Sequence, residues 1–117
     1  MGTHYKPWTQ DDLKRFSDQP QTRILTIEYQ GLVGLATLHV VESLTRKSLI
    51  IEDFIIDKNF RNMGFGTQLL QKIMDFGKEI KADCIEVATQ KNNEIAKRMY
   101  EKAEFKNRQN LTYRLWL

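Results

Sequence analysis

A single apolar run, Ser48–Asp57, constrains the fold more than any other part of the chain. Its apolar residues occupy both odd and even positions, so both faces of an extended strand would be apolar. A strand with two apolar faces is typical of the middle of a sheet that is covered from either side. The run therefore predicts a central strand with helices packed around it. These apolar residues are Leu49, Ile50, Ile51, Phe54, Ile55 and Ile56.

The segments around this strand alternate between helical and extended patterns. Thr9 and the acids after it predict a helix that ends before Pro20, and residues 23–41 predict a hairpin that turns at Gln30-Gly31. A helix of about four turns follows residue 66. A strand at 84–88, a helix at Asn93–Ala103 and a last strand at Leu111–Leu117 complete the order. We therefore expect an α/β (α+β) fold, one domain over residues 1–117, with helices flanking a single mixed, mostly antiparallel sheet.

Composition excludes several classes of protein. With 41% hydrophobic and 28% charged residues, the chain is typical of a soluble globular protein, and it carries no run that predicts a membrane span or a secretory signal. We expect a cytoplasmic protein. A net charge of +3, with acids and bases interleaved, does not favour nucleic-acid binding. The one cysteine, Cys84, is expected to be a buried thiol, and no spacing of metal ligands is present, so we expect no metal.

The segment Arg61–Thr67 carries the clearest sign of chemistry. Its glycines let the backbone turn tightly, and the N–H groups that begin the next helix are free to bind an anion such as phosphate. No acidic residue lies between Gly64 and Met74, which leaves this helix end available to an external anion. A dinucleotide-binding loop would need glycine in place of Leu69, and a phosphate loop would need a Lys-Ser/Thr pair after Gly66. A turn that binds nothing stays an alternative.

Two motifs in one order suggest a family. Arg61, Gly64 and Gly66 match Arg/Gln-x-x-Gly-x-Gly/Ala, and Asn93 to Tyr100 matches Asn-x-x-Ala-x-x-x-Tyr. Over roughly residues 24–117 the chain thus resembles the GNAT acetyltransferases, with a shortened N-terminal part. Glu104 departs from the pattern, because the family usually has glycine there.

The resemblance implies acetyl-CoA as the acetyl donor and assigns residues to it. The backbone of Phe54, Ile55 and Ile56 would run beside the pantetheine arm, and Arg61 would add positive charge near the pyrophosphate. Asn93 and Ala96 would lie against the cofactor. Tyr100 would protonate the departing thiolate as a general acid, the alternative being an aromatic side chain that only packs. The pyrophosphate would bind the amides of Asn62, Met63, Gly64, Phe65, Gly66 and Thr67.

Two carboxylates, Glu52 and Asp53, interrupt the central strand, where a buried charge is costly unless it is paired or used. Successive side chains point to opposite faces unless a bulge intervenes, so one of the two is expected to serve the site. Glu52 resembles the position where several family members, diamine acetyltransferases among them, keep a glutamate as general base. We prefer Glu52, with His39 as the alternative base.

The predicted reaction is direct transfer of an acetyl group to a primary amine, without a covalent enzyme intermediate. About twenty residues precede the first strand, so we expect an open acceptor site for a protein or peptide amine, although Glu42, Glu52 and Asp53 could attract a small polyamine. A non-catalytic module that binds acetyl-CoA or CoA is the alternative function. Trp8 and Trp116 near the chain ends leave room for a homodimer.

Overall fold

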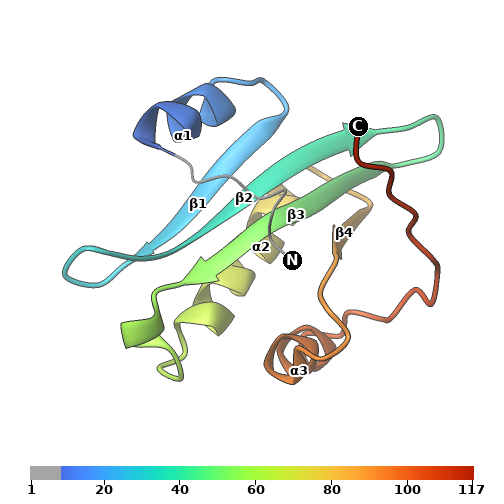
Figure 1. Cartoon of the computed structure of the whole chain (residues 1–117). Coiled ribbons are helices and arrows are strands. Elements are labelled where there is room, and N and C mark those ends of the chain that lie inside the picture. Colours follow the sequence, from blue (N-terminus) through green and yellow to red (C-terminus); the bar gives the residue numbers. More distant parts are fainter. Residues whose placement is uncertain (1–8) are drawn as a thin grey trace.

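The computed structural model describes residues 9–117, which form a four-stranded sheet with helices against it (Figure 1). The strand order is β1-β2-β3-β4; β1, β2 and β3 are antiparallel neighbours, and β4 runs parallel to β3. This is the mixed α+β sheet that the sequence predicts, with the apolar run inside it as β3. The elements are α1 (Gln10–Ser17), β1 (Thr22–Glu28), β2 (Leu32–Glu42), β3 (Lys47–Ile56), the 3-10 turn η1 (Lys58–Phe60), α2 (Phe65–Glu79), β4 (Cys84–Val87) and α3 (Glu94–Lys102).

Local sequence explains where α1 and the first hairpin begin and turn. Thr9 caps α1 in a capping box, because its hydroxyl accepts from the Asp12 N–H while the Asp12 carboxylate accepts from the Thr9 N–H. The turn between β1 and β2 places Gln30 and Gly31 at positive φ, 55° and 125°. Glycine adopts such a conformation without strain, so the turn predicted at Gln30-Gly31 is confirmed.

A β-bulge divides β3 into two halves. Thr37 of β2 pairs with Asp53 and Leu38 pairs with Ile51, so Glu52 has no partner of its own. The extra residue reverses the alternation of side chains along the strand. Leu49 and Ile51, before the bulge, therefore share a face with Phe54 and Ile56, after it, and all four pack into the core.

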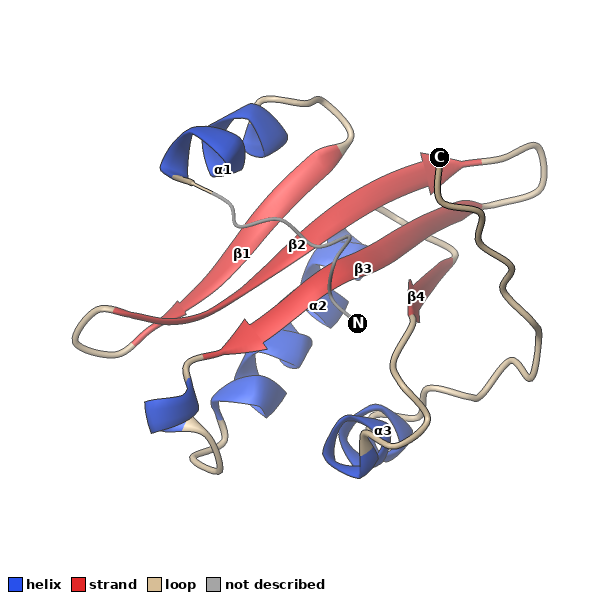
Figure 2. Cartoon of the chain, in the orientation of Figure 1, coloured by secondary structure: helices blue, strands red, loops and turns tan. Residues whose placement is uncertain are grey.

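The core lies between the sheet and α2, which crosses one face of it, as Figure 2 shows. Gly77 lets α2 approach β4 closely, since a Cβ there would lie 3.0 Å from the Ile85 side chain. The opposite face is covered less, because α1 has eight residues and its packing is mainly against β1. The most buried side chains of the core are Val33, Ala36, Leu38, Leu49, Ile51, Leu69, Leu70 and Ile73.

The prediction of a last strand at Leu111–Leu117 is wrong. This segment has no strand structure, and its leucines and Tyr113 are exposed. Alternating apolar residues favour a strand only where a neighbouring strand supplies hydrogen bonds and a surface to pack on. β4 has four residues, and the chain beyond α3 is held to it by the ion pair of Arg108 with Glu86. No helix within residues 9–117 is long and apolar enough to cross a membrane.

Candidate functional site

The second half of β3 has a strand neighbour on one side. β4 pairs with β3 from Ser48 to Ile51 and ends at Val87, whereas β2 continues beside β3 as far as Ile56. The ribbons of β3 and β4 accordingly diverge in Figure 2. The family resemblance implies that the backbone of Phe54–Ile56 lies beside the cofactor. Within residues 9–117 this segment has no strand partner on the β4 side, and we call it the open half of β3.

The glycine-containing loop begins α2 beside this open half. Gly64 is the N-cap, with φ at 85°, and it has no side chain to cap the helix. The first helical hydrogen bond of α2 is donated by Gln68 to the Gly64 carbonyl, so the N–H groups of Phe65, Gly66 and Thr67 precede it. The first turn contains no acidic residue. These are the conditions under which a helix N-terminus binds phosphate.

Gly66 marks the place where three elements meet. A Cβ built on it would lie 3.4 Å from the Met99 sulfur of α3, and 3.9 Å from side-chain atoms of Phe54 and of Ile56 in β3. The loop of α2, the open half of β3 and the inner face of α3 are therefore neighbours. The structure brings together the two sequence motifs, whose glycines and tyrosine lie more than thirty residues apart in the chain.

Two side chains, those of Arg61 and Phe65, hold the loop in place. The Arg61 Nε donates to the Ile56 carbonyl over 3.2 Å, and Asn62 adopts a left-handed conformation with φ at 61°. The Phe65 ring is buried and lies 6.2 Å from the Phe60 ring and 5.7 Å from the Tyr29 ring, centroid to centroid. Phe65 therefore anchors the loop through its side chain, and its backbone N–H remains at the helix end. Met63 and Thr67 are exposed.

Tyr100 is the buried ionisable group next to the open half of β3. Its side chain is 7% exposed, and its ring centroid lies 6.3 Å from that of Phe54 and 5.5 Å from that of Phe105. Burial raises the pKa of Tyr100 to about 12, because an apolar environment disfavours the phenolate. The hydroxyl is therefore protonated at neutral pH, which is the form that a general acid requires.

Asn93 has a structural task that sequence motifs alone did not reveal. Its side-chain oxygen accepts a hydrogen bond from the Ala96 N–H over 3.1 Å and so caps α3. Ala96 is half-buried and packs against the core. The spacing of asparagine three residues before alanine at a helix start is the signal that could have identified this cap.

The two carboxylates at the bulge have different surroundings. The Asp53 carboxylate accepts a hydrogen bond from the Thr37 hydroxyl over 2.5 Å. The Asp53 N–H in turn donates to the Thr37 hydroxyl oxygen over 3.1 Å. Glu52 is exposed and forms no hydrogen bond or ion pair with the residues that the structure describes. His39 lies farther along β2, where its ring packs edge-on against Phe16 at 5.1 Å.

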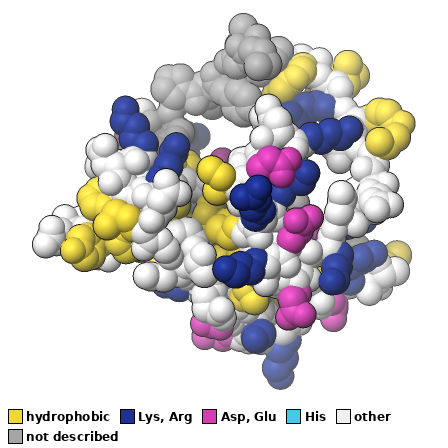
Figure 3. Space-filling view, turned by 90° about the horizontal axis from the view of Figure 1, so that it is seen from below, with side chains coloured by type: hydrophobic (Ala, Val, Ile, Leu, Met, Phe, Trp, Pro, Cys, Tyr) yellow, Lys and Arg dark blue, Asp and Glu magenta, His cyan; other side chains and the backbone are white. Residues whose placement is uncertain are grey.

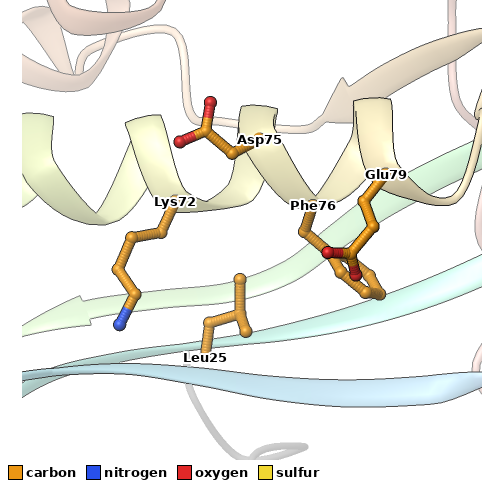
Figure 4. Close-up of a pocket in the computed structure, with 5 residues that line it drawn as sticks. All are labelled: Leu25, Lys72, Asp75, Phe76 and Glu79. Carbon is orange, nitrogen blue, oxygen red and sulfur yellow. The ribbon is translucent and has the colours of Figure 1, made fainter.

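Two hollows lie outside the core. One, of about 190 Å³, lies between α1 and the face of the sheet that carries Asp53. The other lies between α2 and β1, and Figure 4 shows the five side chains that line it: Leu25, Lys72, Asp75, Phe76 and Glu79. This second hollow contains none of the residues predicted for the site, and its Lys72 ammonium donates to the Thr26 carbonyl. We therefore associate it with no chemistry.

The view from below places charged side chains around an apolar surface, and basic residues gather there beside acidic ones (Figure 3). No group of three or more His, Cys, Asp or Glu side chains within residues 9–117 could hold a metal ion.

Comparisons with known proteins identify the family and the fold. Residues 1–105 match the family described as Acetyltransferase (GNAT). Among solved structures, an aminoglycoside acetyltransferase, meta-AAC0020, from an uncultured soil metagenomic sample is 17% identical with a TM-score of 0.82, over 98% of this chain and 78% of that one. A putative acetyltransferase from Agrobacterium tumefaciens is 21% identical with a TM-score of 0.81, over 95% and 84%.

A third solved structure carries a ligand. AAC(6')-Iy, in complex with a bisubstrate analog, CoA-S-monomethyl-acetylneamine, is 14% identical with a TM-score of 0.77, over 92% of this chain and 77% of that one. At these identities the likeness shows the shared fold, and the residue assignments for this chain must come from its own geometry.

Proposed function

The chain belongs to the GNAT acetyltransferase family, and from that premise we propose that it transfers the acetyl group of acetyl-CoA to a primary amine. The acetyl group passes directly from the thioester to the amine in a ternary complex. One observation carries the proposal: the open half of β3, the uncapped start of α2 and the buried hydroxyl-bearing side chain of Tyr100 border one another.

The residues present fit acetyl-CoA. The free N–H groups of Phe65, Gly66 and Thr67 suit a pyrophosphate, and the guanidinium of Arg61 adds positive charge beside them. The backbone of Phe54–Ile56, which lacks a strand partner on the β4 side, suits the amide groups of an extended arm. Acetyl-CoA supplies an acetyl group already activated as a thioester.

The chain's own groups then divide the proton transfers. The carboxylate of Glu52, directly or through water, takes a proton from the incoming ammonium, so that a neutral amine attacks the thioester carbon. A backbone N–H near Ile55 stabilises the oxyanion, and the Tyr100 hydroxyl gives its proton to the leaving thiolate. The attacking nitrogen loses its extra proton as the tetrahedral intermediate collapses, and that proton returns to the Tyr100 oxygen. The products are the acetylated amine and CoA. Holding both substrates against one strand contributes to the rate.

The first experiment is thermal unfolding of the full chain with acetyl-CoA, CoA or NAD. A ligand that binds the folded state alone stabilises it by RT ln(1 + [L]/Kd), so we expect acetyl-CoA and CoA, but not NAD, to raise the midpoint. Release of free thiol from acetyl-CoA with a panel of amines then tests transfer. No shift at millimolar cofactor contradicts the assigned site, and a shift without transfer to any amine favours the non-catalytic CoA-binding module.

A further inference from the structure

The hydroxyl of Thr37 holds the bulge at the start of the open half of β3. Its oxygen accepts a hydrogen bond from the Asp53 N–H over 3.1 Å, and its proton is donated to the Asp53 carboxylate over 2.5 Å. We call these two bonds the Thr37 bridge. Both of them join Thr37 to the residue that pairs with it where the register shifts. One hydroxyl therefore holds the backbone and the side chain of the residue that follows Glu52.

Thr37 occupies a position where an apolar side chain would suit the packing. It is 5% exposed, and Leu35, two residues before it in β2, is 7% exposed. Burying a hydroxyl costs free energy unless it is hydrogen-bonded. Valine has the same branched shape and would fill this place without that cost. What the hydroxyl adds here is therefore the pair of bonds to Asp53.

Two contacts show which way the backbone N–H groups point after the bulge. The Asp53 N–H faces β2, and the Asp57 N–H donates to the carbonyl of Val33, which also belongs to β2. Successive residues of a strand point their N–H groups to opposite sides. The N–H groups of Phe54 and Ile56 therefore face the open side, and the donor that we assign to the oxyanion is one of these two.

The open half of β3 has few other restraints. β2 pairs with it on one side, and no strand within residues 9–117 pairs with it on the other. At its far end the Arg61 Nε donates to the Ile56 carbonyl. At its start a bulge interrupts the regular ladder of backbone hydrogen bonds, and there the Thr37 bridge supplies an acceptor for the Asp53 N–H. The bridge is thus the contact that fixes the direction in which the open half leaves the bulge.

We propose that Thr37 is a positioning residue for acetyl transfer, because its bridge to Asp53 orients the N–H groups of Phe54 and Ile56 toward the thioester oxygen. The inference rests on the proposed function, since it takes the open half of β3 as the place of the thioester. Thr37 acts through the Asp53 backbone and not on the reacting atoms. A donor whose direction is fixed beforehand stabilises the oxyanion most, so losing the bridge should affect turnover more than binding.

The test compares Thr37→Val, which keeps the branched shape and removes the bridge, with Thr37→Ser, which keeps the hydroxyl. Removing an oxyanion donor outright lowers kcat by about 10²–10³-fold, and a donor that only changes direction should cost about tenfold. We therefore expect Thr37→Val to lower kcat about tenfold, with the KM of acetyl-CoA within about twofold. Thr37→Ser should keep kcat within about threefold, because its hydroxyl can form the same two bonds.

Thr26→Val is the matched control. Thr26 lies in β1, and its hydroxyl forms no hydrogen bond with the residues that the structure describes, so kcat should stay within about twofold. Urea unfolding checks that each variant is folded in the assay, and Thr37→Ala replaces Thr37→Val if the latter is not. An unchanged kcat in Thr37→Val, a KM that rises as much as kcat falls, or an equal loss in Thr37→Ser would each overturn the proposal.

Amide measurements by NMR distinguish a failure of the proposed function. In Thr37→Val, hydrogen exchange should rise about tenfold more at the Asp53 N–H than at the Leu49 N–H, which lies before the bulge. If no amine is acetylated, acetyl-CoA should still shift the amide signals of Phe54 and Ile56, and shift them less in Thr37→Val. Equal shifts in the two chains, or equal exchange at Asp53, would overturn the positioning role. No shift in the unaltered chain would overturn both that role and the assigned cofactor site.

Discussion

The two halves of β3 have different neighbours and, on our account, different tasks. Before the bulge, Ser48–Ile51 is paired on both sides, and Leu49 and Ile51 are almost fully buried. After the bulge, Phe54–Ile56 is paired with β2 alone, and Ile55 is 43% exposed. One strand therefore builds the core with its first half and, on our account, presents backbone and side chains to ligands with its second. The bulge at Glu52 is what separates the two.

The largest expected effect is on the free energy of unfolding, when one side chain is truncated before the bulge and another after it. Leu49→Ala removes a fully buried side chain and should lower the free energy of unfolding by about 2–5 kcal/mol. Ile55→Ala removes a half-exposed one and should cost less than about 1 kcal/mol. Urea unfolding of both variants measures the difference. Equal losses would show that the open half is as much a part of the core as the paired half.

The next effect concerns turnover at the open half. Tyr100→Phe removes the proposed general acid and keeps the ring that packs on Phe54 and Phe105, so kcat should fall about 10²-fold while the Kd of acetyl-CoA changes little. Tyr29→Phe is the control, because it removes a hydroxyl from a half-exposed ring that packs on Phe65. An unchanged kcat in Tyr100→Phe would leave Tyr100 a packing residue.

The stability of the chain at alkaline pH tests the burial of the Tyr100 hydroxyl, and this measurement needs no assay of activity. The Tyr100 pKa is about 12 in the folded chain and near 10 when unfolded, so between these values the unfolded state loses a proton that the folded state keeps. Stability is then full below pH 10 and falls as pH rises to 12, by as much as about 3 kcal/mol. Urea unfolding at stepped pH should show this loss in the unaltered chain and a smaller one in Tyr100→Phe. Identical slopes would contradict the burial of the hydroxyl.

A smaller effect tests the anion site at the start of α2. Thr67→Glu places a carboxylate in the first helical turn, where the helix dipole favours it, so stability should hold or rise by about 0.3–1 kcal/mol. The same charge repels a pyrophosphate, and the Kd of acetyl-CoA should rise about tenfold. Thr67→Gln, equal in size and neutral, is the control. A Kd that is the same for Thr67→Glu and Thr67→Gln would place the pyrophosphate elsewhere.

Sequence patterns predicted the elements that carry their own local signals. The capping acids after Thr9, the turn at Gln30-Gly31 and the helical spacing after Gly66 are all contained in short stretches, and the structure confirms each of them. Sequence patterns allowed for a bulge but did not locate it, because its position depends on the register between β2 and β3. The residues paired there, Thr37 and Asp53, lie about fifteen residues apart in the chain. The last strand failed for the same reason, since its alternation says nothing of whether a partner edge exists.

Sequence patterns could predict which positions belong to the candidate site, but not how their side chains contact one another. Spacing placed Arg61 and Gly64 before a helix, where the structure has them, and it placed Tyr100 on the inner face of the next helix. Gly66, expected on the loop, is the second residue of α2. The proximity of Gly66 to Met99, and the hydrogen bond from Thr37 to Asp53, arise from packing between distant segments. No local pattern encodes such contacts.

The smallest expected effect is the loss of stability when the N-terminal cap of α3 is removed. Asn93 caps this helix, so Asn93→Ala should cost about 1 kcal/mol in thermal or urea unfolding. Asn93→Ser retains a capping oxygen and should restore most of the loss. Acetyl-CoA affinity separates the cap from the cofactor contact that the motif implies, because serine lacks the amide. If Asn93→Ser is stable yet binds acetyl-CoA as weakly as Asn93→Ala, Asn93 contacts the cofactor. If it binds like the unaltered chain, Asn93 acts by capping α3, which the packing of Met99 and Tyr100 also holds beside the open half.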